Sequence, residues 1–372
     1  MAINSFPGSS GGGLPGHNFI DQIYVSSRVR RWVRAGSPGY YRALSGLGEA
    51  NGFIFFVQSD STIVQAPLGG VAEVTLPFTE IRILTAAQDL ISLYKVAAKT
   101  TDSLTLSPNY TTITSTGLYT FPTNAVGFCD ALLVGGGGGA YHHGGGGGGG
   151  GIVEISSIPL KVSGTFSVQV GTAGATQSNG GDTVFLNHTA KGGGGATGDS
   201  GNGKNGPTGG GGTCSSSSGN FAGGTGDGNI PQLVSDKSRD SWLASVGTSL
   251  SVPLPMQDAV IRFTGSSWNG GSINGSGHTG GGGAGATGNG TNGSGTTPGQ
   301  GGPGISIAWG NIPAKFYSAG GGGSNHNNQN NGPGGGTGWN NSAGHYGMGG
   351  DSEFNSVQSP TGGVVYIKTW SV

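Results

Sequence analysis

Charged residues are scarce in this chain, and the two signs almost cancel. Only 9% of the 372 residues are Asp, Glu, Lys or Arg, and the formal net charge is −1. An ordinary soluble domain has about 25% charged residues. Such a sparse and balanced charge gives no electrostatic basis for binding nucleic acid or an anionic membrane. We therefore expect no nucleic-acid partner and no insertion into a membrane.

Cysteines are few, and long apolar runs are missing. The two cysteines, Cys129 and Cys214, have no metal-binding or redox spacing, so we expect reduced thiols and no disulfide scaffold. No stretch reaches the roughly 18 apolar residues of a transmembrane helix. The N-terminal sequence MAINSFPGSSGGG has neither the charged start nor the apolar stretch of a secretory signal.

Recognisable catalytic motifs are missing as well. GxGxxG patterns recur, but none stands between a strand and a helix, as nucleotide binding requires, and no nucleophile elbow occurs. Asp236, Asp240 and Asp258 could form a carboxylate pair for glycan cleavage, although polar residues on a hairpin explain them more simply. The adjacent His142 and His143 lack the further ligands of a metal site, unless another chain supplies them. The sequence predicts no enzymatic activity, no cofactor and no metal site.

Glycine, by contrast, is abundant, with 84 residues that lie largely in uninterrupted runs. The longest stretch, residues 134–153, reads VGGGGGAYHHGGGGGGGGIV, and further runs follow at residues 192–195, 209–212, 280–283, 320–323 and 334–336. An isolated run would be a flexible linker. Backbones without side chains can also approach closely, and an extended threefold helix leaves every N–H and C=O free for neighbouring chains. We therefore predict a bundle of polyglycine II helices held together by backbone hydrogen bonds.

The reversals of the chain predict where the loops of this bundle lie. Residues 131–139 would run away from the N-terminal part and residues 144–155 would return, so residues 140–143 should lie at the far end. By the same count, residues 171–180 and 196–208 form further loops at that end. The two ends are well separated, because the eight-glycine run spans about 25 Å at about 3.1 Å per residue.

The N-terminal part of the chain has an ordinary composition. Residues 1–18 are predicted to form an arm and residues 19–112 a small β-module of sandwich or barrel type. Residues 24–34 partly alternate, with Tyr24, Val29 and Trp32 as candidate core anchors. The cluster of Arg28, Arg30, Arg31 and Arg34 favours a solvated strand face or an inter-subunit contact over nucleic-acid binding. Further strands are predicted at residues 53–57, 71–76, 80–84, 90–96 and 103–107, and residues 86–93 could instead form helical turns.

Residues 113–372 form the glycine-rich region, in which short apolar segments alternate with the runs. The predicted strands are residues 131–134, 152–155, 165–170, 183–186 and 364–370. Residues 231–268 have few glycines and their own apolar content, which indicates an inserted β-hairpin or small subdomain. The predicted fold class is therefore all-β: a small N-terminal β-module, then a glycine-rich domain of short strands and packed polyglycine II helices.

A resemblance to known proteins rests on this glycine-rich region. Residues 117–181, with LYTFPTNAVGFCDALLVGGGGGA and FSVQVGTAGATQSNGGDTVF, resemble the glycine-rich domain of bacteriophage tail-fibre proteins, and the closing GGVVYIKTW resembles their last strand. Glycine runs separated by variable loops are also similar to the distal adhesins of T-even-type phages, which are polyglycine II bundles with receptor-binding loops at the tip.

The resemblance implies a virion protein of the phage tail, assembled in the host cytoplasm. Residues 19–112 would attach to other tail or baseplate proteins, and residues 113–372 would bind a receptor on the bacterial cell surface, either a glycan or an outer-membrane protein. The implied assembly is a homotrimer or a single cap on a trimeric fibre. The alternative is a purely structural tip or cap protein without receptor specificity.

Aromatic and histidine side chains among small polar residues are the candidate receptor contacts. Binding surfaces of this kind combine rigid aromatic anchors with small, adaptable polar residues. Each ring could instead cover the bundle and shield its backbone hydrogen bonds. The predicted receptor-binding residues are Tyr141, His142, His143, Trp268, His326, Trp339 and Tyr346.

Overall fold

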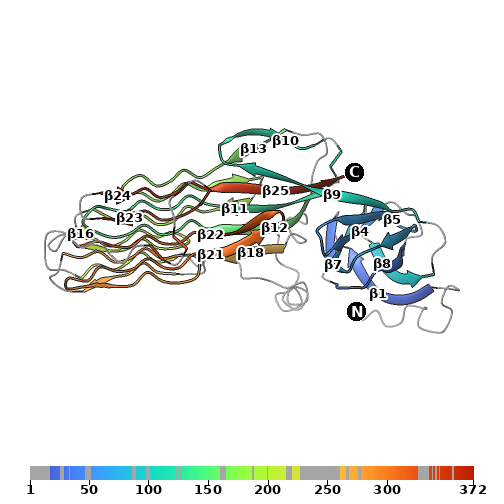
Figure 1. Ribbon diagram of the computed structural model, residues 1–372, viewed down its shortest axis with the longest axis horizontal. Coiled ribbons are helices and arrows are strands. Elements are labelled where there is room, and N and C mark those ends of the chain that lie inside the picture. Colours follow the sequence, from blue (N-terminus) through green and yellow to red (C-terminus); the bar gives the residue numbers. More distant parts are fainter. Residues whose placement is uncertain are drawn as a thin grey trace, which may run out of the picture.

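The computed structural model confirms the predicted all-β class. It describes residues 17–25, 29–32, 34–46, 52–85, 89–97, 101–122, 124–125, 128–159, 165–186, 188–198, 200–214, 220–226, 260–264, 268–274, 278–325, 335–336, 338–339, 342, 344–353 and 356–372. Within these residues there are strands and no helix. Figure 1 shows an elongated molecule, with the N-terminal sheets at one end and the glycine runs at the other.

Two sheets pack face to face in the N-terminal part. The first is antiparallel with the order β1-β8-β3-β6, formed by β1 (His17–Val25), β3 (Gly39–Ser45), β6 (Val71–Val74) and β8 (Asp89–Val96). It covers one face of β4 (Gly52–Gln58) and β7 (Phe78–Thr85). Alternate residues of these two strands, such as Ile54, Phe56, Ile81 and Ile83, are fully buried in the core between the sheets.

The second sheet runs through most of the molecule, in the order β18-β12-β11-β25-β9-β5-β4-β7-β2. Besides β4 and β7 it contains β2 (Val29–Trp32), β5 (Ile63–Pro67), β9 (Leu104–Ile113), β11 (Phe128–Val134), β12 (Ile152–Pro159), β18 (Val260–Thr264) and β25 (Val364–Ser371). All neighbours are antiparallel. Because β12 also contacts β2, the sheet curls almost into a barrel.

Strand β9 links the N-terminal strands to the glycine-rich region. Its first residues pair with β5, and residues 107–113 pair with β25, the last strand of the chain. The predicted boundary at residue 112 therefore lies inside a strand. Pro108 is accommodated there because β9 has passed the end of β5 and is unpaired on that side.

The middle of the molecule is built on β11, which is buried on both faces. Cys129, Ala131 and Leu133 face a third sheet, and Leu132 and Val134 face a hairpin. The third sheet, in the order β10-β13-β14-β15, is formed by β10 (Gly117–Thr120), β13 (Thr165–Gln169), β14 (Thr183–Phe185) and β15 (His188–Ala190). The hairpin is formed by β21 (Ile305–Trp309) and β22 (Ile312–Tyr317). Burial on both faces explains why β11 is apolar at almost every position instead of alternating.

The glycine runs form the rest of the molecule and are assigned to no regular helix or strand. Along residues 135–139, successive N–H groups donate to residues 151, 181, 361, 148 and 178, so every third N–H returns to the same segment. Residues 144–151 exchange backbone hydrogen bonds with six other segments. A three-residue period and neighbours on every side are what the predicted polyglycine II packing requires.

Short strand pairs lie along these runs. They are β16 (Ser200–Gly201) with β17 (Thr213–Cys214), β19 (Ile273–Asn274) with β20 (Gly293–Ser294), and β23 (Asp351–Ser352) with β24 (Val357–Gln358).

Several predicted elements are corrected by the structure. Residues 24–34 are divided between β1 and β2, and residues 89–93 belong to strand β8 instead of a helical turn, because their alternate side chains enter the buried core. Most of the predicted insert at residues 231–268 lies outside the described residues. Its described strand, β18, pairs with β12 at the edge of the long sheet. Strands β3, β5, β10, β15, β21 and β22 were not predicted, and neither were the short pairs β16–β17, β19–β20 and β23–β24.

Candidate functional site

The glycine bundle has two distinct ends. Residues 135–139 leave β11 and residues 144–151 return to β12, so the turn at residues 140–143 lies at the end away from the sheets. Figure 1 shows β16, β23 and β24 near that same end. We call this end the tip, and the end beside β11, β12 and β25 the base. The predicted position of residues 140–143 agrees with this arrangement.

Three predicted site residues lie together at the tip. The ring of His142 is 4.4 Å from the ring of Tyr141 and 4.8 Å from that of His143, measured between centroids. Tyr141 is buried, whereas both histidines are partly exposed. His143 has a φ of 61° in the left-handed region, which is uncommon for a residue other than glycine. A tight turn thus holds the two half-buried histidines beside a buried tyrosine.

Other loops meet this turn, in part as predicted. The N–H of Gln177 donates to the carbonyl of Ala140 at 3.2 Å, and the N–H of Ala196 donates to the carbonyl of Gly139 at 2.9 Å. The loops at residues 175–178 and 196–198 therefore belong to the tip. Thr208 does not, because its hydroxyl donates to the carbonyl of Gly149 on the way back to the base. The predicted third loop at residues 196–208 is thus a tip turn followed by a returning run.

The β23–β24 hairpin supplies the acidic groups of the tip. The Asp351 carboxylate accepts a hydrogen bond of 2.6 Å from the N–H of Gly322, and burial raises the pKa of Asp351 to about 7. The Glu353 carboxylate accepts hydrogen bonds from the side chains of Ser356 and Gln358, which lower its pKa. The tip therefore combines imidazoles, small hydroxyl and amide side chains and two carboxyl groups that titrate in different ranges.

The remaining predicted site residues are not gathered at the tip. The indole N–H of Trp268 donates to the carbonyl of Ala286 at 3.2 Å, near the base. Tyr346 packs with Tyr366 in the side-chain core beneath the β21–β22 hairpin. The indole N–H of Trp339 donates to the carbonyl of Gly349 at 2.7 Å. His326 lies outside the described residues. The side-chain core exists because the unpredicted β21–β22 hairpin covers the base, whereas each of the two indole N–H groups is bound by a backbone carbonyl.

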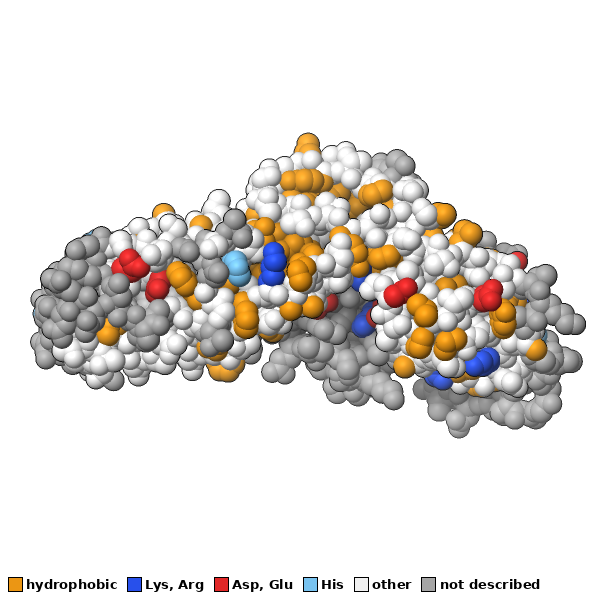
Figure 2. Space-filling model, viewed as in Figure 1, with side chains coloured by type: hydrophobic (Ala, Val, Ile, Leu, Met, Phe, Trp, Pro, Cys, Tyr) orange, Lys and Arg blue, Asp and Glu red, His pale blue; other side chains and the backbone are white. Residues whose placement is uncertain are grey.

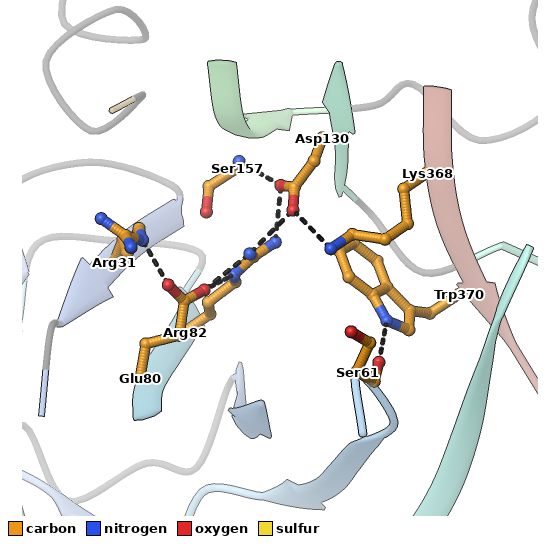
Figure 3. Close-up of polar contacts among 8 residues, drawn as sticks. All are labelled: Arg31, Ser61, Glu80, Arg82, Asp130, Ser157, Lys368 and Trp370. Atoms are coloured by element: carbon orange, nitrogen blue, oxygen red, sulfur yellow. Dashed lines mark hydrogen bonds and ion pairs between the residues drawn. The ribbon is translucent and has the colours of Figure 1, made fainter. Parts of the chain in front are cut away.

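A second polar cluster lies where the N-terminal strands meet β11 and β25 (Figure 3). The Arg82 guanidinium on β7 donates to both carboxylate oxygens of Asp130 on β11, at 2.8 and 3.0 Å, and to Glu80 at 2.6 Å. Arg31 on β2 also donates to Glu80, at 2.5 Å. Lys368 on β25 lies 3.4 Å from Asp130. We call these five residues the junction network.

Burial and aromatic rings set the electrostatics of the junction network. The Arg82 guanidinium lies over the rings of Phe128 and Trp370, at 5.1 and 4.9 Å from their centroids. Burial opposes the charge on Asp130, but Arg82 and Lys368 outweigh it and hold the pKa of Asp130 below its usual value. Because each carboxylate is satisfied from within the network, we assign it the role of a joint between β2, β7, β11 and β25.

The sequence contained a signal for this joint that the prediction missed. Asp130 is the single charged residue in the apolar strand FCDALLV, and a carboxylate in a fully buried strand requires a buried cationic partner. The predicted arginine cluster is partly explained in the same way. Arg31 pairs with Glu80, and Arg34 pairs with Asp21.

The other hollow and polar features carry no recognisable chemistry. A shallow groove of about 420 Å³ on the outer face of the third sheet is lined by Leu118, Val184 and Leu186 with neighbouring serine, threonine and glutamine side chains. Cys129 is a free, buried thiol, and burial raises its pKa. In the part of the chain that the structure describes, no three His, Cys, Asp or Glu side chains converge as metal ligands would. The carboxylates predicted at residues 236, 240 and 258 lie outside that part.

Comparison with known proteins identifies a family for most of the glycine-rich region. Residues 111–369 match a family model described as a glycine-rich domain. No curated protein matches the chain. Among the described residues, none form a helix that could span a lipid bilayer.

Proposed function

This chain belongs to the glycine-rich domain family, and from that premise we propose that it is a receptor-binding protein of a bacteriophage tail, carried by a fibre or at the tail tip. The tip of the bundle would contact a glycan or an outer-membrane protein of the bacterial surface. The N-terminal strands would attach to other tail or baseplate proteins, as a homotrimer or as one cap on a trimeric fibre. The protein would act by binding, without catalysis.

The observation that carries the proposal is the contrast between the two ends of the bundle. The base continues into side-chain cores and into the junction network, which would hold it to the N-terminal strands. The tip consists of turns that present His142, His143 and small polar residues on rigid glycine runs. A rigid scaffold with variable polar loops at one end is the arrangement that binding sites commonly use.

The test is the adsorption of purified full-length chain to a panel of bacterial strains. The variant combines His142→Ala with His143→Gly, because glycine accepts the left-handed backbone of residue 143. Tyr141 stays, since it is buried and its carbonyl accepts the Ser352 hydroxyl. We expect the double variant to fold normally and to bind cells about tenfold more weakly or worse.

The matched control is Lys191→Ala, an exposed residue at the base, which should bind as the wild type does. Strains lacking outer-membrane proteins or surface glycans then separate the two receptor classes. If the double variant adsorbs as strongly as the wild type, the tip is not the receptor-binding site. A wild-type chain that binds no strain but assembles with tail proteins would favour the structural cap.

A further inference from the structure

A sequence motif marks the outer runs of the glycine bundle. The pattern Asn-Gly-x-(Asn, Asp or Ser) occurs at residues 179–182, 202–205, 269–272 and 289–292, as NGGD, NGKN, NGGS and NGTN. The polar residues at its first and fourth positions are exposed or half-buried. They are three residues apart, which is the period of the backbone hydrogen bonds in the bundle.

Every one of these eight side chains accepts a hydrogen bond from a backbone N–H of a neighbouring run. Asn202 and Asn205 accept from Ala222 and Thr225 at 2.9 and 2.8 Å. Asn289 and Asn292 accept from residues 269 and 272 at 2.7 and 2.8 Å. The other four acceptors are Asn179, Asp182, Asn269 and Ser272, whose donors are the N–H groups of Gly195, Gly192, Gly226 and Gly223.

The bonds are reciprocal. The N–H of Gly203 donates to the carbonyl of Ala222, whose own N–H donates to the Asn202 side chain. Likewise, the N–H of Gly290 donates to the carbonyl of Asn269, whose own N–H donates to the Asn289 side chain. Inside the bundle, the N–H groups of residues 146–151 all donate to backbone carbonyls. Side-chain hydroxyls accept from this run only at residues 144 and 145, beside the tip turn. The side-chain acceptors of the motif, six of which are amides, therefore lie on runs at the outside of the bundle.

We propose that the four motifs form the lateral boundary of the bundle and prevent it from adding a run from a second copy of this chain. A side-chain amide offers the same C=O group as a peptide bond, so each cap takes the place of a carbonyl that a further run would supply. Unpaired backbone donors along an edge are templates for association, and the caps remove them. This inference goes beyond the proposed function and does not depend on it.

The test compares two full-length variants with the wild type. The first changes Asn202, Asn205, Asn289 and Asn292 to Ala, which removes four acceptors. The second changes the same four residues to Ser, which keeps a neutral acceptor such as Ser272 already provides. Amide hydrogen exchange reports on the donors, and sedimentation velocity over a range of concentrations reports on association.

In the alanine variant we expect about tenfold faster exchange at residues 222, 225, 269 and 272, and assemblies larger than the wild type that grow with concentration. The serine variant should match the wild type in sedimentation. Faster exchange without new association would refute the proposal that the motifs prevent a second copy from adding to the bundle. Unchanged exchange would show that the side chains do not protect these donors. If the fourfold alanine variant does not fold, Asn202→Ala with Asn205→Ala alone is judged by the same two measurements.

Discussion

Phe56 and Gly146 lie in two cores of opposite construction. Phe56 is fully buried between two sheets, where its ring packs on Tyr41 and Phe78 at centroid distances of 5.2 and 5.1 Å. Gly146 has no side chain, and a Cβ placed on it would lie 2.0 Å from the carbonyl oxygen of Gly321. The first core is filled by side chains and the second by backbones in direct contact.

The difference determines which sequence changes each core can absorb. A side-chain core responds to truncation by partial collapse, so the loss of stability depends on how well the neighbours relax. The glycine core has nothing to truncate, and any addition meets another backbone whose position is fixed by hydrogen bonds to further runs. Figure 2 agrees with this division, because orange side chains gather over the sheets whereas much of the bundle surface is white.

The largest effect should follow from Gly146→Ala. One methyl group would lie 2.0 and 2.5 Å from the carbonyl oxygen and carbon of Gly321, so the neighbouring runs must separate. We expect a loss of about 3 kcal/mol or more in the free energy of unfolding, comparable to the effect of Phe56→Ala although only one carbon is added. Thermal and urea unfolding of both variants provide the measurement.

The control for this substitution is Gly117→Ala in β10, where a Cβ would meet only the Tyr119 ring at 3.5 Å. It should change stability by less than about 1 kcal/mol. A Gly146→Ala variant with the unfolding midpoint of the Gly117→Ala variant would refute the packing of backbone against backbone.

The two cores also differ in how much of them the sequence could predict. The local sequence was enough to predict the glycine runs and the apolar strand around residue 131. Counting the reversals of the chain placed residues 140–143 at the tip. Pairing over long distances was not visible, because β9 and β25 are joined by hydrogen bonds between residues about 250 apart in the chain. No local pattern specifies such a register.

The candidate site was predictable to a similar extent. Tyr141, His142 and His143 could be placed because the turn lies between two glycine runs of known direction. Tyr346 could not, because its environment is the core formed by the β21–β22 hairpin, which was not predicted. Trp268 and Trp339 could not either, because their indole N–H groups bind carbonyls of runs whose position no local pattern specifies. The spacing of the capping motifs was visible, but its meaning depends on which runs are neighbours.

An effect of similar size concerns the junction network, where charged side chains form the bonds that backbone groups form in the bundle. Arg82→Met would leave Asp130 and Glu80 buried without their main partner, so we expect a loss of about 3–5 kcal/mol. Arg34→Met breaks a pair with Asp21 that is partly exposed and should lose less than about 1 kcal/mol. Urea unfolding of the two variants checks the difference, and equal losses would contradict the role of a buried joint.

The smallest effect concerns Asp351, a half-buried carboxyl group of the tip. Its pKa is about 7 in the folded chain, against about 3.9 for an unfolded aspartate. A raised folded pKa means that the contribution to stability is fully present below about pH 4 and is lost as the pH rises through about 7. An asparagine side chain at this position would keep an acceptor for the N–H of Gly322 without a titrating group.

We therefore expect Asp351→Asn to match the wild type near pH 4 and to be more stable at pH 8, by about 1–3 kcal/mol. Unfolding midpoints between pH 4 and pH 8 measure the divergence. The control is Glu353→Gln: a lowered pKa means that the charged form of Glu353 stabilises the folded chain above about pH 5, so this variant should be slightly less stable than the wild type at pH 8 and should approach it toward pH 4. Parallel curves for Asp351→Asn and the wild type would show that the pKa of Asp351 is not raised in the folded tip. Curves that diverge as described would show that a side-chain charge is tolerated poorly even at the end of a core made of backbone.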